Sequence, residues 1–219
     1  MITLEDVIKN AEVRAFIEGA QKQLQALGYT EHSYRHIGIV SKRTGEILQK
    51  LGYDEKTIEL GKIAGYLHDI GNCVNRANHA HTGAILAYNI LKEMGMPPED
   101  RTEIVSAIGN HDEGTGTAVS AISAALILAD KSDVHRDRVT NKNMATFDKH
   151  DRVNYAVTDA RLTINKEERK ISLDIEIDTE ICPVIDYFEI FIDRTVMSKY
   201  AAKYLNIWFE LIINGTKLL

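Results

Sequence analysis

The chain has 219 residues, of which 44% are hydrophobic and 26% charged, with only three prolines. This length suits one large domain, or one main domain with a small appendage, and the composition argues against long disordered tracts. The formal net charge of -6 leaves no global basic field, so we expect no long nucleic acid as a partner.

The cysteine content and the hydropathy pattern bear on the compartment. Cys73 and Cys182 are the two cysteines, far apart and outside any Cys-x-x-Cys pattern, so neither a disulfide framework nor a thiolate zinc site is indicated. No stretch reaches the roughly 18 uninterrupted apolar residues of a membrane span, and the first residues lack the apolar core of a secretory signal. We therefore expect a cytoplasmic protein with no membrane contact.

The first two thirds of the chain are predicted to be helical. From Ile2 to about Asp133 the apolar residues recur at spacings of three and four, which is typical of successive amphipathic helices. Glycine and proline interrupt this pattern at regular places. The spacing predicts helices over residues 4–26, 32–51, 55–71, 79–94, 98–111 and 117–133.

The period of the pattern changes after a polar stretch, Asn141–Arg152. Apolar residues then alternate with polar ones over 160–164 and 171–177, which predicts two strands that form a hairpin through 165–169. A helix is predicted from Pro183 to about Tyr204, followed by a strand over Trp208–Ile213. The fold class is thus mainly α, with a helical domain over 1–140 and a small α+β C-terminal appendage over 141–219 packed on it.

Histidines cluster in the helical part, where six of the eight lie between residues 32 and 111. The sharpest local signal is Leu67-His68-Asp69-Ile70-Gly71, in which an apolar helix ends in a His-Asp doublet. Imidazole and carboxylate groups from neighbouring helices of a bundle can converge on one cation. We expect three further residues to meet the doublet: His32 near the start of one predicted helix, His111 at the end of another and Asp130 late in a third.

Three elements in order resemble the HD superfamily of metal-dependent phosphohydrolases: the segments 31–36 (Glu-His-Ser-Tyr-Arg-His), 67–71 and 128–133 (Leu-Ala-Asp-Lys-Ser-Asp). The resemblance implies an HD-type helical bundle over about residues 28–135. It also implies that the first metal ion is held by His32, His68, Asp69 and Asp130. His36, one turn after His32, could substitute for it, but we interpret His36 first as a supporting or structural residue.

Two further segments, His79-Ala80-His81-Thr82-Gly83 and Asn110-His111-Asp112, resemble relatives with more than one metal ion. By this resemblance His79 and His111 are additional ligands, and Asp69 is the natural carboxylate to bridge two ions. A mixed imidazole and carboxylate set suits Mn, Fe, Ni, Co or Zn, with Mg as a further candidate. The sequence leaves open both the metal and the choice between one ion and two.

The predicted function is hydrolysis of a phosphate ester or phosphoanhydride in a small nucleotide-like substrate through a metal-activated water. Asp69 is the predicted catalytic carboxylate, and Arg35 and Lys131 are predicted to bind a substrate phosphate. Both cations have an ordinary alternative as solvated surface charges. Two positions differ from the motifs of known subgroups: Asp112 stands where the subgroup that acts on cyclic dinucleotides has a second histidine, and Asn72 stands where a lysine is common. Activity on cyclic dinucleotides or on stringent-response nucleotides is therefore not expected.

Two other functions compete with hydrolysis. The first is a metal-containing nucleotide-binding or sensor protein that has lost turnover, and the second is a di-iron oxygenase, which would need a larger ligand set. A small phosphorylated molecule is the expected partner, and a homodimer is compatible with the aromatic residues between Tyr187 and Tyr204.

Overall fold

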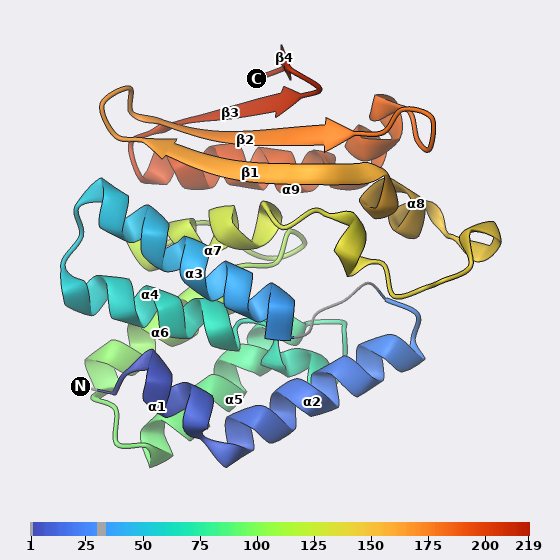
Figure 1. The fold of residues 1–219 in the computed structure, drawn as a ribbon. Helices are drawn as coiled ribbons and strands as arrows, with labels where there is room; N and C mark the ends of the chain where they lie inside the picture. The colour runs from blue at the N-terminus through green and yellow to red at the C-terminus, as the bar shows by residue number, and fades with distance from the viewer. Residues whose placement is uncertain (1, 30–33) are drawn as a thin grey trace.

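The computed structural model describes residues 2–29 and 34–219 as a helical assembly that carries a four-stranded sheet on one side (Figure 1). This bears out the predicted mainly α class with a β-containing C-terminal part. The helices are α1 (Leu4–Lys9), α2 (Ala11–Ala26), α3 (Tyr34–Leu51), α4 (Glu55–Leu67), α5 (His79–Glu93), α6 (Pro98–Gly109), α7 (Ala121–Lys131), α8 (Lys149–Ala156) and α9 (Val184–Tyr204), with short 3₁₀ turns η1 (Ile70–Cys73), η2 (Arg136–Arg138) and η3 (Met144–Thr146).

Helix α7 lies at the centre of the helical part. Its sequence from Ile122 to Ala129 is apolar but for one serine, and every residue of this stretch is buried. A helix that is apolar all round must be covered on all sides. Helices α3, α4, α6 and α9 supply that cover, and the end of α7 therefore lies inside the molecule.

The sheet has the strand order β1 (Val157–Asn165), β2 (Lys170–Ile177), β3 (Trp208–Ile213) and β4 (Thr216–Lys217). Strands β1 and β2 form the predicted antiparallel hairpin, whereas β3 lies parallel to β2 and is reached through α9. A parallel neighbour needs such a crossover. Figure 1 shows α9 along the face of the sheet that is turned toward the helices, where it packs on α7.

Several predicted boundaries are wrong. The single helix expected over 4–26 is two helices, because the side chain of Asn10 accepts hydrogen bonds from the backbone N–H groups of Glu12 and Val13 and so begins a new helix. The helix expected over 55–71 ends at Leu67, and the one expected from 117 begins after its cap, Ser120. Helix α8 lies where a polar stretch without regular structure was expected.

Among the residues described, no helix combines the length and the apolar character that a bilayer crossing demands.

Candidate metal centre

The turn after α4 brings the His-Asp doublet against α5. Gly71 follows the doublet in η1, and a Cβ atom built there would lie 2.0 Å from the carbonyl oxygen of His79 and 2.5 Å from the amide nitrogen of Gly83. Only glycine permits so close an approach of two backbones. The spacing of the His-Asp-Ile-Gly segment thus fixes the distance between Asp69 and the first turn of α5, which carries His79.

Three buried histidines are oriented in the same way by the backbone. The Nδ1 atom lies 2.9 Å from the Gly65 carbonyl oxygen in His68, and 2.6 Å from the Ile108 carbonyl oxygen in His111. In His79 the Nδ1 atom lies 3.1 Å from the Arg76 carbonyl oxygen. Because a carbonyl can only accept, each Nδ1 carries the hydrogen and each Nε2 presents a lone pair. Metal-binding histidines are oriented in this manner.

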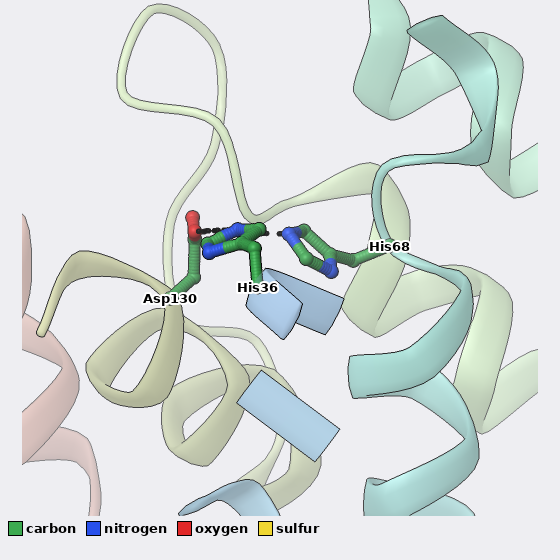
Figure 2. Close-up of side chains that lie close together, drawn as sticks. All are labelled: His36, His68 and Asp130. Carbon is green, nitrogen blue, oxygen red and sulfur yellow. Dashed lines mark ion pairs between the residues drawn. The ribbon is translucent and has the colours of Figure 1, made fainter. Parts of the chain in front are cut away.

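His36 joins the same group from α3. Its Nδ1 lies 2.7 Å from Asp133 Oδ2, and its Nε2 lies 3.3 Å from Asp130 Oδ1. Figure 2 shows His36 between Asp130 and His68, with the three side chains converging from three helical segments. The sequence analysis assigned His36 a supporting role; its Nε2 instead lies among the atoms that could bind a metal ion.

Asp69 lies between two pairs of histidines. Its Oδ2 is 3.3 Å from Nε2 of His68 and 3.7 Å from Nε2 of His36. Its Oδ1 is 3.4 Å from Nε2 of His79 and 3.9 Å from Nε2 of His111. Each carboxylate oxygen therefore faces its own pair of nitrogen donors.

The donor atoms are close enough to hold metal ions. Those of His36, His68 and Asp130 lie within 4.8 Å of one another, and so do those of His68, Asp69 and His111. The Nε2 atoms of His79 and His111 are 3.1 Å apart although both present lone pairs, a contact that is favourable only with a cation or a proton between them. Burial holds the pKa of His111 down to about 3, which disfavours the proton.

Charge in the cluster also suits a cation. Burial would raise the pKa of Asp130, but Lys131 and the neighbouring imidazoles outweigh it and hold that pKa well below its usual range. Burial would lower the pKa of His68, yet Asp69 and Asp130 raise it to about 10. The Asp130 carboxylate is thus ionised, and with Asp69 it favours positive charge at His68, which a metal ion could supply in place of a proton. Imidazole and carboxylate together suit a divalent transition metal.

The two cations predicted to bind substrate phosphate both have acidic partners. Lys131 Nζ is 2.7 Å from Asp130 Oδ2 and 3.2 Å from Glu113 Oε2, with only 4% of its side chain exposed. Arg35 pairs at 3.2 Å with Asp133, the residue that orients His36. In this structure both act on the charge and orientation of the cluster, and their contact with a substrate stays a prediction.

Two functional candidates were missed from the sequence. The buried Asn72 donates from Nδ2 to Asp69 Oδ1 at 2.9 Å and so orients the central carboxylate, although its position was noticed only as a departure from a common lysine. Arg76 was not singled out. Its Nη1 lies 3.2 Å from Nε2 of His79 and 3.9 Å from Asp69 Oδ1, and 27% of its side chain is exposed. A cation three residues before a candidate ligand was the available signal.

The remaining predicted residues lie elsewhere or cannot be placed. The prediction for His32 falls outside the described residues, which leave out 30–33. His81, on the first turn of α5, is exposed to solvent. His68, Asp69, His79, His111 and Asp130 are brought together, as the sequence analysis expected of metal ligands.

Fold and cluster together define a helical protein with a buried His/Asp centre. The family model for the HD domain matches residues 33–136, which contain this centre from His36 to Asp130. Residues 33–136 thus match the HD domain, as the three sequence motifs predicted.

Two known proteins are similar to part of this chain. An uncharacterized protein of Methanocaldococcus jannaschii, MJ1020, is 29% identical over 157 residues; the matched part is 61% of this chain and 60% of that protein. The chain therefore matches three fifths of the length of this curated relative. A solved structure of a predicted HD superfamily hydrolase from an uncultured Thermotogales bacterium is 23% identical, with a TM-score of 0.44, over 61% of this chain and 75% of that one.

Proposed function

We propose that the protein is a cytoplasmic metal-dependent phosphohydrolase that cleaves a phosphate ester or phosphoanhydride of a small, nucleotide-like substrate. The observation that carries the proposal is the position of Asp69, whose two oxygens each face a pair of histidine Nε2 atoms. Surplus donors of this kind support two ions, which is the arrangement that hydrolyses phosphate esters in many unrelated proteins.

In this proposal His36, His68 and Asp130 would hold one ion, His79 and His111 would hold a second, and Asp69 would contribute to both. Divalent ions at such a site supply positive charge to phosphoryl oxygens and lower the pKa of water toward neutrality. The protein's own contribution is to orient the ligands and to keep Asp130 ionised. Backbone carbonyls fix the histidine rings on their Nδ1 side, and the Lys131 ammonium keeps the Asp130 carboxylate ionised.

Arg76 is the residue that we assign to the substrate. Its guanidinium lies beside His79 and remains partly exposed, so it can donate two parallel hydrogen bonds to a phosphate that enters over the second ion position. The nucleotide-like character of the substrate rests on the resemblance of the motifs to small HD hydrolases.

The test is a phosphate-release screen coupled to metal analysis. The purified protein is loaded in turn with Mn, Fe, Ni, Co, Zn and Mg and offered nucleoside mono-, di- and triphosphates, dinucleoside polyphosphates and simple phosphomonoesters. We expect turnover with at least one transition metal and its loss in Asp69→Asn. His81→Ala, which changes an exposed histidine on the same helix as His79, is the matched control and should retain activity.

The competing function is that of a catalytically silent metal-containing nucleotide sensor. It would be favoured if a nucleotide bound tightly to the metal-loaded protein and no combination of metal and substrate released phosphate. Binding and turnover are therefore measured on the same preparations.

A further inference from the structure

A cavity lies away from the metal centre, at the C-terminal end of α9 and along β3 and β4. Its volume is about 820 Å³, within the range of small-molecule sites. We call it the basic groove. Five of its lining residues are cationic and one, Glu210, is acidic; the cations are Arg169, Lys170, Lys199, Lys203 and Lys217.

The positive charge of the basic groove is unusual for this protein, whose net charge is -6. Glu210 accounts for only part of it, because it pairs with both Lys217 at 2.7 Å and Lys170 at 3.4 Å. Lys199 and Lys203 have no acidic partner within residues 2–29 and 34–219. They lie one helical turn apart on α9, a spacing at which like charges repel, so an anion bound between them would relieve that repulsion.

Two aromatic side chains flank these lysines. Trp208, at the start of β3, is 78% exposed, and Tyr200, between the two lysines on α9, is 60% exposed. An exposed indole offers a flat face on which another ring can stack. Strand β4 pairs only with Ile212 and Ile213, which leaves Trp208 at the open end of β3.

We propose that the basic groove is a second ligand site that binds a free nucleoside phosphate, with the base stacked on Trp208 and the phosphates held by Lys199 and Lys203. The cavity is large enough for such a molecule, and its wall combines a stacking face with the ammonium groups of Lys199 and Lys203. The proposal is independent of the function assigned to the metal centre, since the two sets of residues do not overlap.

The chain offers a direct reporter, because Trp208 is its only tryptophan. Titration of the full-length, chelator-treated protein with ATP should quench the Trp208 fluorescence, excited where adenine does not absorb. Equilibrium dialysis with radiolabelled ATP gives the affinity independently. Tripolyphosphate and adenosine, titrated separately, should each bind at least tenfold more weakly than ATP, because each makes only one of the two contacts.

The variants separate this site from the metal centre. Lys199→Gln combined with Lys203→Gln should weaken ATP binding about tenfold or more, and Trp208→Ala should do the same in dialysis. Lys9→Gln combined with Lys42→Gln removes two exposed lysines of α1 and α3 as the charge-matched control and should leave the affinity unchanged. Asp69→Asn should also leave ATP binding in the basic groove unchanged.

Four results would overturn the proposal. ATP binding that is lost in Asp69→Asn and kept in the lysine variant would assign the nucleotide to the metal centre. Tripolyphosphate that binds as tightly as ATP would show a simple anion site, and a single-stranded oligonucleotide that binds much more tightly than ATP would show a nucleic-acid surface. No quenching and no dialysis signal at millimolar ATP would show that no nucleotide binds.

Discussion

At the scale of single residues, the organisation of the centre depends on Asp69. Each of its oxygens faces two histidine nitrogens, and Asn72 fixes the plane of the carboxylate through a hydrogen bond of 2.9 Å. The histidines around it belong to one pair or the other, so their removal should not have equal effects. Metal stoichiometry can therefore distinguish the central residue from the peripheral ones.

We predict that Asp69→Ala loses both ions, whereas His79→Ala and His111→Ala each retain about one ion per chain. His68→Ala should lose the ion shared with His36 and Asp130, and activity should fall with it. Elemental analysis of protein purified without chelator, with circular dichroism to establish folding, measures the outcome. Full metal content in folded Asp69→Ala would contradict the assignment, and His81→Ala serves as the control.

At the scale of elements, the sequence predicted best those features whose residues are neighbours along the chain. The His-Asp doublet, its glycine and the β1–β2 hairpin are contiguous, so periodicity and turn residues sufficed to find them. The position of His36 in the cluster could not be predicted in this way, because the sequence places both His32 and His36 near the start of one predicted helix. What brings His36 to Asp130 is its long-range contact with Asp133, 97 residues later in the chain.

Other elements were missed for similar reasons. Helix α8 is short and polar, and a tertiary contact rather than an apolar stripe holds it in place, since it packs on η2. The parallel pairing of β2 with β3 depends on how α9 crosses between them, which no local pattern encodes. The same long-range placement creates the basic groove from α9, β3 and β4.

The packing of η1 on α5 gives a prediction at this scale. Gly71→Ala would place a methyl group 2.0 Å from a backbone oxygen of His79, so η1 must move away from α5. We expect a loss of about 1–3 kcal/mol in the free energy of unfolding, together with weaker metal binding. Thermal unfolding and metal titration measure both effects.

Gly38→Ala is the matched control for that change. Gly38 lies on the exposed side of α3, and a Cβ atom there would meet nothing within 4 Å. Alanine should stabilise this helix by about 0.5–1 kcal/mol. If the two variants behaved alike, the close approach at Gly71 would not be the constraint that sets the geometry of the centre.

At the scale of the whole molecule, the C-terminal sheet and its helix are joined to the metal centre through Glu113. This residue follows His111 and pairs with Lys131 at 3.2 Å and with Arg194 of α9 at 2.8 Å. Burial would raise the pKa of Glu113, but the two cations outweigh it and lower the pKa from 4.5 to about 2. One carboxylate thus connects α7, α9 and the loop after α6.

This pKa gives a pH dependence of defined sign. Because the folded pKa is depressed, the Glu113 carboxylate stabilises the fold fully above about pH 4.5, and this stabilisation is lost as the pH falls toward about 2. Glu113→Gln should therefore be less stable than the parent by up to about 3 kcal/mol at pH 7, with the difference vanishing near pH 2. Denaturant unfolding across this range measures it. A constant difference would contradict the prediction, and Glu46→Gln, on an exposed ion pair with Lys42, should show almost none.

The last prediction concerns the covering of α7 by the C-terminal part. Helix α9 buries Tyr187, Phe191 and Ala201, and it packs on α7, which is apolar on every side. A chain that ends before Asn141 lacks α9 and the sheet, so it would expose an apolar face of α7 to water. We expect this fragment to aggregate or to change its oligomeric state, as measured by light scattering during size-exclusion chromatography.

The control is the full-length Arg194→Gln variant. It removes the ion pair to Glu113 but keeps the apolar cover of α9, so it should elute as the parent does. If the fragment ending before Asn141 stayed soluble, kept the parent's oligomeric state and retained full activity, the helical part would be self-sufficient. In that case the contact between α7 and α9 would be a docking of two independent units. Aggregation of the fragment beside an unaltered Arg194→Gln variant would show that apolar burial, rather than the ion pair, unites the two parts of the molecule.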